Sequence, residues 1–260
     1  MNTQLRQAAS RVAQVRSEPV DRVRIENSSR RVRTHFGGIP VADSRHALLV
    51  WESKRPPIYY FPAGDVRMDL LKATNDASDK TRFTLQVESR VAENAAWSYN
   101  RPGPDWERLK DHMAFFWNKM DAWYEEDDEV FVHPRDPYVR VDVLTSSRHV
   151  RVELDGHVLA DTHRPHLLFE TGLPTRYYIP KLDVRMDLLE ATDSHTMCPY
   201  KGTATYWSVR VGDAVHQDLV WSYPAPIPEC PKIVNLLSFY NERVDIYVDG
   251  ELQPRPLPRS

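Results

Sequence analysis

The chain has 260 residues, of which 41% are hydrophobic, and its formal net charge is −3. The apolar fraction excludes wholesale disorder, and the lack of a basic excess argues against a nucleic-acid-binding protein. No apolar run approaches the roughly 18 residues of a membrane span, so we expect no membrane partner. Residues 1–18 are polar and lack the apolar core of a secretory signal. With only Cys198 and Cys230 there is no disulfide framework, and we expect a cytoplasmic protein.

An internal duplication is the strongest feature of the sequence. A shift of 118 residues aligns Arg22–Thr74 with Arg140–Thr192 without a gap, and 25 of these 53 positions are identical. The best-matched stretch is Asp65–Leu71, which recurs as Asp183–Leu189. A period of this length indicates two whole domains rather than a solenoid.

The second copy carries an insert that the first copy lacks. Further along the chain the shift becomes 124, where Trp97–Tyr99 matches Trp221–Tyr223. The difference, 124 − 118 = 6, equals the length of Cys198–Thr203, whose sequence is CPYKGT. Beyond it, we align Phe116–Asn118 with Phe239–Asn241 at a shift of 123.

These shifts predict a division into three parts. Residues 1–19 form a flexible N-terminal arm, residues 20–135 the first and diverged repeat, and residues 136–260 the second repeat with the intact motif. We place the boundary beside two prolines that follow the acidic run 125–129. We also expect the two repeats to pack against each other.

The pattern within one copy predicts a mostly β fold. Alternating Val150, Val152 and Leu154 are followed by Asp155-Gly156, which is typical of a tight hairpin turn. The segment 183–189 is ambiguous between strand and short helix. Apolar residues spaced i, i+3, i+4, i+7 over 233–240 predict one late amphipathic helix, and residues 109–120 of the first copy repeat that spacing. We therefore expect two small antiparallel β domains, each with one late helix.

The second copy resembles the domain-of-unknown-function family 427, which has also been labelled nucleotidyltransferase-like. The resemblance is carried by residues 160–180, 183–189, His195, the insert, and the Tyr206-Trp207 and Trp221-Ser222-Tyr223 motifs. It implies a β-tent fold, shared with the cereblon ligand-binding domain and methionine sulfoxide reductase B. Those relatives usually hold zinc with four cysteines, so this chain would be a zinc-free version.

Aromatic side chains crowd the second copy and suit a small-molecule pocket. The insert and the aromatics together give eight candidate ligand-binding residues: Tyr177, Arg185, Cys198, Tyr200, Lys201, Trp207, Trp221 and Tyr223. For about half of the aromatic residues, the alternative interpretation is that they pack in the core and bind no ligand. For Arg185, set between Asp183 and Asp187, the competing reading is a structural ion-pair network, and we favour it because the first copy keeps the trio.

The hypothesis that the protein is an enzyme depends on one thiol, that of Cys198. A nearby cation lowers the pKa of a cysteine and makes it nucleophilic, and both His195 and Lys201 lie three residues from Cys198. The alternative reading is an inert packing cysteine. His163 and His166 could join His195 and Cys198 around a metal, but their spacing matches no zinc motif, so we expect neither metal nor cofactor.

Three functions follow from these patterns. The first is a small-molecule-binding module with an aromatic pocket in the second domain and a ligand of unknown identity. The second is an enzyme that uses Cys198 as nucleophile or redox thiol. The third is an interaction scaffold built from the pseudo-symmetric repeats. The phosphate-binding and serine-hydrolase motifs are missing from the sequence, and we favour a binding module over an enzyme.

Overall fold

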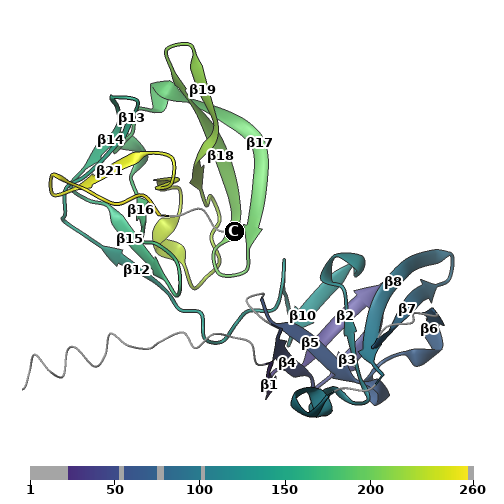
Figure 1. The fold of residues 1–260 in the computed structure, drawn as a ribbon. Helices are drawn as coiled ribbons and strands as arrows, with labels where there is room; N and C mark the ends of the chain where they lie inside the picture. The colour runs from purple at the N-terminus through teal and green to yellow at the C-terminus, as the bar shows by residue number, and fades with distance from the viewer. Residues whose placement is uncertain (1–22, 53–55, 75–78, 101–102, 257–260) are drawn as a thin grey trace, which may run out of the picture. The chain divides into compact units, whose positions relative to one another are not determined.

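The computed structural model describes residues 23–52, 56–74, 79–100 and 103–256, so the expected N-terminal arm, residues 1–19, lies outside the described residues. The chain divides into two compact units between Glu129 and Val130, where the sequence analysis placed the division at 135/136. Both units are built almost entirely from antiparallel strands and short 3-10 turns (Figure 1). The prediction of two tandem, mostly β domains is confirmed.

The first domain contains two sheets, one of seven strands in the order β1-β4-β5-β9-β8-β7-β6 and one of four in the order β11-β10-β2-β3. The strands are β1 (Arg24–Asn27), β2 (Val32–Phe36), β3 (Ile39–Ser44), β4 (Leu48–Trp51), β5 (Ile58–Pro62), β6 (Leu71–Thr74), β7 (Lys80–Val87), β8 (Arg90–Tyr99), β9 (His112–Phe115), β10 (Ala122–Glu125) and β11 (Asp128–Glu129). The 3-10 turns are η1 (Ala63–Asp65), η2 (Met68–Leu70), η3 (Pro104–Leu109) and η4 (Trp117–Lys119).

The second domain repeats this topology with three sheets, ordered β12-β15-β16, β14-β13-β21-β22 and β17-β18-β19-β20. The strands are β12 (Val141–Thr145), β13 (Val150–Leu154), β14 (His157–Thr162), β15 (His166–Glu170), β16 (Arg176–Tyr178), β17 (Leu189–Cys198), β18 (Gly202–Val211), β19 (Ala214–Ser222), β20 (Leu237–Phe239), β21 (Asp245–Val248) and β22 (Glu251–Leu252). The 3-10 turns are η5 (Lys181–Asp183), η6 (Met186–Leu188) and η7 (Pro231–Ile233). The sheets ending in β16 and β20 meet through two backbone hydrogen bonds between Ile179 and Leu237, of 2.7 and 2.9 Å.

Local sequence explains most of these strands. The alternating segment 150–154 forms β13, in which Val150, Val152 and Leu154 are buried and the two residues between them are half-buried. Asp155 and Gly156 both have positive φ, +50° and +79°, as the predicted two-residue hairpin requires. The ambiguous segment 183–189 contains the last residue of η5, the whole of η6 and the first residue of β17.

The predicted late helix is wrong. The segment forms the turn η7 and the strand β20, which pairs with β19. Asn235 has φ +57°, and its counterpart Asp111 has φ +59°, which a right-handed helix does not accommodate. The helical spacing arises because the segment contributes to two apolar clusters: Leu237 to one and Ile233 to the other.

The alignment of the repeats is also corrected here. The ring centroids of Trp221 and Tyr240 lie 4.6 Å apart, and those of Trp97 and Phe116 lie 4.5 Å apart. Tyr240 is therefore equivalent to Phe116, at a shift of 124, and not to Trp117. The shift falls to 123 only further along the chain, where Trp123 and Ile246 occupy equivalent sheet positions.

Each domain has two apolar clusters on opposite sides of its central strands. In the second domain the larger cluster includes Leu219, Leu237 and Phe239. The smaller cluster is formed mainly by aromatic and sulfur-containing side chains together with Leu168 and Ile233, and it includes Tyr178, Tyr206, Trp221, Tyr223, Cys230 and, at its edge, Cys198. This smaller cluster is where the candidate site lies.

Candidate functional site

The insert forms the tip of the β17–β18 hairpin. Cys198 and Gly202 are the last paired residues, and Pro199–Lys201 forms the turn. Gly202 has φ +104°, and a Cβ there would lie 3.2 Å from the carbonyl oxygen of Ala225. The Ile227 amide donates to the Lys201 carbonyl over 3.1 Å. These contacts fix the tip against the segment that follows β19, and they fix the direction of the Lys201 side chain.

A pocket of about 150 Å³ opens beside this tip. Its walls come from β15, β16, β18 and β19, with further residues that follow β15, β17, β19 and β20. The lining residues are Leu168, Glu170, Leu173, Arg176, Tyr178, Lys201, Tyr206, Trp221, Tyr223 and Tyr240. Side chains alternate across a strand, so Tyr178, Tyr206 and Trp221 share the face that meets the pocket.

A buried ion pair closes one side of the pocket. Lys201 Nζ donates to Glu170 Oε2 over 2.5 Å, and the two side chains are only 11% and 9% exposed. Removing two charges from water is expensive, and the pair offsets that cost only where its geometry is good. The insert therefore supplies a cation that neutralises a carboxylate already present in both repeats.

Arg176 contributes a second cation to the pocket. Its guanidinium lies 5.5 Å from the ring centroid of Trp221 and 6.0 Å from that of Tyr240. Its two terminal nitrogens donate to the carboxylate of Glu242 over 2.7 and 2.8 Å. This bidentate contact holds the guanidinium over the aromatic rings.

Burial favours the protonated form of three tyrosine hydroxyls of the pocket. It raises the pKa values of Tyr178, Tyr223 and Tyr240 above that of a free phenol, since a phenolate would be poorly solvated there. The Trp221 indole N–H donates to the Tyr178 hydroxyl over 3.1 Å. The Tyr206 and Thr196 hydroxyls share a hydrogen bond of 2.6 Å.

Three of the eight predicted ligand-binding residues line this pocket: Lys201, Trp221 and Tyr223. Tyr177 and Trp207 alternate with pocket residues on their strands and therefore point to the opposite cluster. Arg185 is exposed and forms a bidentate ion pair with Asp187.

Tyr200 lies on the insert but serves another contact. Its hydroxyl accepts a hydrogen bond of 2.8 Å from the backbone amide of Asp136. Burial raises the pKa of Tyr200 to about 12. Its ring centroid lies 6.3 Å from that of His133. Tyr200 therefore ties the insert to the segment that enters the second domain.

The residues proposed to activate Cys198 do not converge on it. Cys198 is half-buried at the edge of the smaller cluster. His195 precedes it by an odd number of residues on β17 and so points to the other face, where its Nδ1 contacts the carbonyl of Asp193 at 2.8 Å. Lys201 is paired with Glu170. The geometry thus joins Lys201 to the pocket rather than to the thiol.

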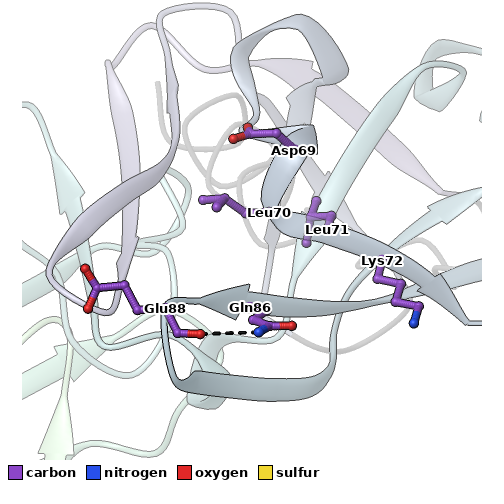
Figure 2. A pocket seen from close by; sticks show the side chains of 6 residues that line it. All are labelled: Asp69, Leu70, Leu71, Lys72, Gln86 and Glu88. Atoms are coloured by element: carbon purple, nitrogen blue, oxygen red, sulfur yellow. Dashed lines mark hydrogen bonds between the residues drawn. The ribbon is translucent and has the colours of Figure 1, made fainter.

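A second hollow, of about 290 Å³, lies in the first domain beside η2 and β7. Figure 2 shows the charged groups around it, Asp69, Lys72 and Glu88, pointing in different directions. Its charged side chains are exposed, and the only drawn contact is between Gln86 Nε2 and the Glu88 carbonyl. Among the described residues that line this hollow, the polar side chains are all exposed, so it is a poorer candidate than the aromatic pocket.

Seven of the ten lining residues were not among the predicted ligand-binding residues: Leu168, Glu170, Leu173, Arg176, Tyr178, Tyr206 and Tyr240. A comparison of the repeats would have found two of them, since Arg176 replaces Ile58 and Tyr240 replaces Phe116. The contact with Lys201 gives Glu170 a structural role in the pocket wall.

Among the described residues, no group of three or more histidine, cysteine or acidic side chains is arranged to hold a metal ion. The described part of the chain also contains no helix that is long and apolar enough to cross a membrane.

A family model described as Domain of unknown function (DUF427) matches residues 24–126 and again residues 142–250. The two matches coincide with the two structural domains. No curated protein matches the chain.

Proposed function

The chain belongs to the DUF427 family as a tandem pair of its domains, and because that description assigns no activity, we propose a function from the site itself. The second domain is a small-molecule-binding module, and its ligand lies in the pocket lined by Tyr178, Tyr206, Trp221 and Tyr223. The first domain is its diverged structural partner.

One observation carries this proposal. Aromatic side chains from several strands converge on one hollow, and a buried ion pair, Glu170 and Lys201, forms part of its wall. Apolar walls with a few fixed polar groups are the usual composition of a ligand site. A core designed only for packing would fill this space with apolar side chains and would avoid the cost of burying two charges.

The alternative function is an enzyme that uses Cys198. It has weaker support, because neither His195 nor Lys201 is directed at the thiol. The scaffold function has no specific observation in its favour. A binding module also accounts for the restriction of the insert to one repeat, since Lys201 belongs to the pocket wall.

A blocking variant tests the proposal. Leu173 lies at the rim of the pocket and is only half-buried, so Leu173→Trp fills the opening without disturbing the core. The matched control is Leu182→Trp, because Leu182 is 90% exposed and lies outside the pocket. We screen a library of single-ring fragments against the full chain by ligand-observed NMR.

We expect the fragments that bind the wild-type chain to lose at least about tenfold in affinity, equal to about 1.4 kcal/mol, in Leu173→Trp. They should bind the Leu182→Trp control as well as the wild type. Fragment binding that is equal in both variants would contradict the proposal, and so would the absence of any binding fragment.

A further inference from the structure

The two domains hold the same four side chains around their smaller clusters but use them differently. The equivalent pairs are Glu52 and Glu170, Tyr60 and Tyr178, Trp97 and Trp221, and Tyr99 and Tyr223. In both domains the indole N–H donates to the first tyrosine hydroxyl, over 3.0 Å in the first domain and 3.1 Å in the second. We call these four side chains the frame. The frame is the same in both domains, so the two sites differ in the residues that surround it.

In the first domain the polar groups of the frame form hydrogen bonds with one another. The hydroxyl of Tyr60 donates to Glu52 over 2.5 Å, and the hydroxyl of Tyr99 donates to the same oxygen over 3.4 Å. The carboxylate therefore accepts hydrogen bonds from both tyrosine hydroxyls. In addition, the ammonium of Lys80 lies 4.4 Å from the ring centroid of Tyr99. Both tyrosine hydroxyls therefore have their acceptor within the domain.

In the second domain the insert changes this balance. Lys201 forms an ion pair with the carboxylate of Glu170. Among the described residues, neither the Tyr178 hydroxyl nor the Tyr223 hydroxyl then has an acceptor for its proton. Position 204, equivalent to Lys80, is an alanine, so no lysine from that position covers the Tyr223 ring.

The result is a pocket lined by several hydrogen-bond donors. An ammonium has three N–H donors, and Lys201 uses one of them on Glu170. The two tyrosine hydroxyls add two more donors. Arg176, where the first domain has Ile58, adds a guanidinium whose charge is balanced by Glu242. These donors line the pocket, and a ligand that supplies charged acceptor oxygens can form charge-assisted hydrogen bonds with them.

We infer that the second-domain pocket selects a single flat ring that bears a carboxylate. This inference rests on the proposed function and names its ligand class. The ring stacks among the aromatic walls, and the carboxylate accepts from Lys201, Tyr178 and Tyr223. The pocket volume of about 150 Å³ is well below the roughly 300–1,000 Å³ of sites for drug-sized ligands, which limits the occupant to about one ring.

Three probes of the same shape test the inference: benzoate, benzamide and benzamidinium. Their planar substituents are respectively acceptor-only, mixed, and donor-only. We measure their affinities for the full chain by NMR titration. We expect benzoate to bind at least about tenfold more tightly than benzamide, because it gains charge-assisted hydrogen bonds. Benzamidinium should bind more weakly than benzamide.

Matched variants locate the effect. Tyr223→Phe removes one donor but keeps the ring, and we expect it to weaken benzoate binding about tenfold. Tyr99→Phe, the equivalent change in the first domain, should leave benzoate affinity unchanged. Lys201→Met should weaken benzoate binding more than benzamide binding.

The outcomes separate the ligand class from the pocket. Preferential binding of benzamide or benzamidinium, abolished by Leu173→Trp, would overturn the carboxylate inference and leave the pocket function standing. The same holds if none of the three probes binds but other fragments do so in a manner sensitive to Leu173→Trp. If nothing binds at that site, both fail together.

Discussion

The insert lysine should stabilise the second domain through its buried contact with Glu170. Lys201→Met removes the ammonium and leaves a carboxylate whose side chain is 9% exposed. Removing one partner of a buried ion pair costs about 3–5 kcal/mol of unfolding free energy. We expect a value near 3 kcal/mol, at the low end, because Tyr178 and Tyr223 can donate to Glu170. Glu52 is satisfied in this way in the first domain.

Hydrogen exchange measures this cost domain by domain. We follow the amides of β15 and β18 in the full chain and use amides of the first domain as an internal reference. Lys232→Met is the control, because Lys232 is exposed and should cost no more than about 0.5 kcal/mol. The double variant Lys201→Met, Glu170→Gln should be more stable than Lys201→Met alone. If Lys201→Met costs no more than Lys232→Met, the ion pair does not have the role assigned to it.

Two further predictions follow from the hairpin tip and the cysteines. Gly202→Ala should destabilise the second domain by about 1–3 kcal/mol and more than Gly212→Ala, since only Gly202 combines positive φ with a close backbone neighbour. Thermal unfolding checks this, and equal losses would refute it. Iodoacetamide should label Cys198 in the native chain and leave Cys230, which is 2% exposed and whose pKa is raised by burial. Equal labelling of both would contradict this packing.

The duplication made much of the fold predictable. Strands with clear alternation, such as β13, and hairpins with a residue pair suited to positive φ, such as Asp155-Gly156, followed directly from local sequence. The late helix failed because spacing alone does not distinguish a helix from a strand that touches two clusters. The left-handed residue Asn235 interrupts the segment, and its conformation is set by the tertiary structure.

The site was predictable only in part. Lys201, Trp221 and Tyr223 were identified because they lie on or near the motifs of the second repeat. Arg176 was missed because it lies on a strand that looked structural, and its role depends on contacts with Trp221 and Glu242, which are distant in sequence. The side of the strand was not assigned for Tyr177, and the structure turns it to the opposite cluster.

The restriction of the insert to one repeat now has a physical interpretation. Lys201 binds the shared carboxylate, and that contact leaves the protons of Tyr178 and Tyr223 without an acceptor among the described residues. The first repeat keeps the equivalent tyrosines, but their hydroxyls donate hydrogen bonds to Glu52. The six-residue insert thus distinguishes the second-domain pocket, which is lined by donors, from the first-domain cluster, whose tyrosines donate to Glu52.

One measurement tests the central claim most directly. We label the tyrosines of the full chain with carbon-13 and titrate it with benzoate under NMR. The account predicts that the ring resonances of Tyr178 and Tyr223 shift with a single saturable affinity, while those of Tyr60 and Tyr99 do not move. Equal shifts in both pairs, or shifts in neither, would contradict a ligand pocket that is specific to the second domain.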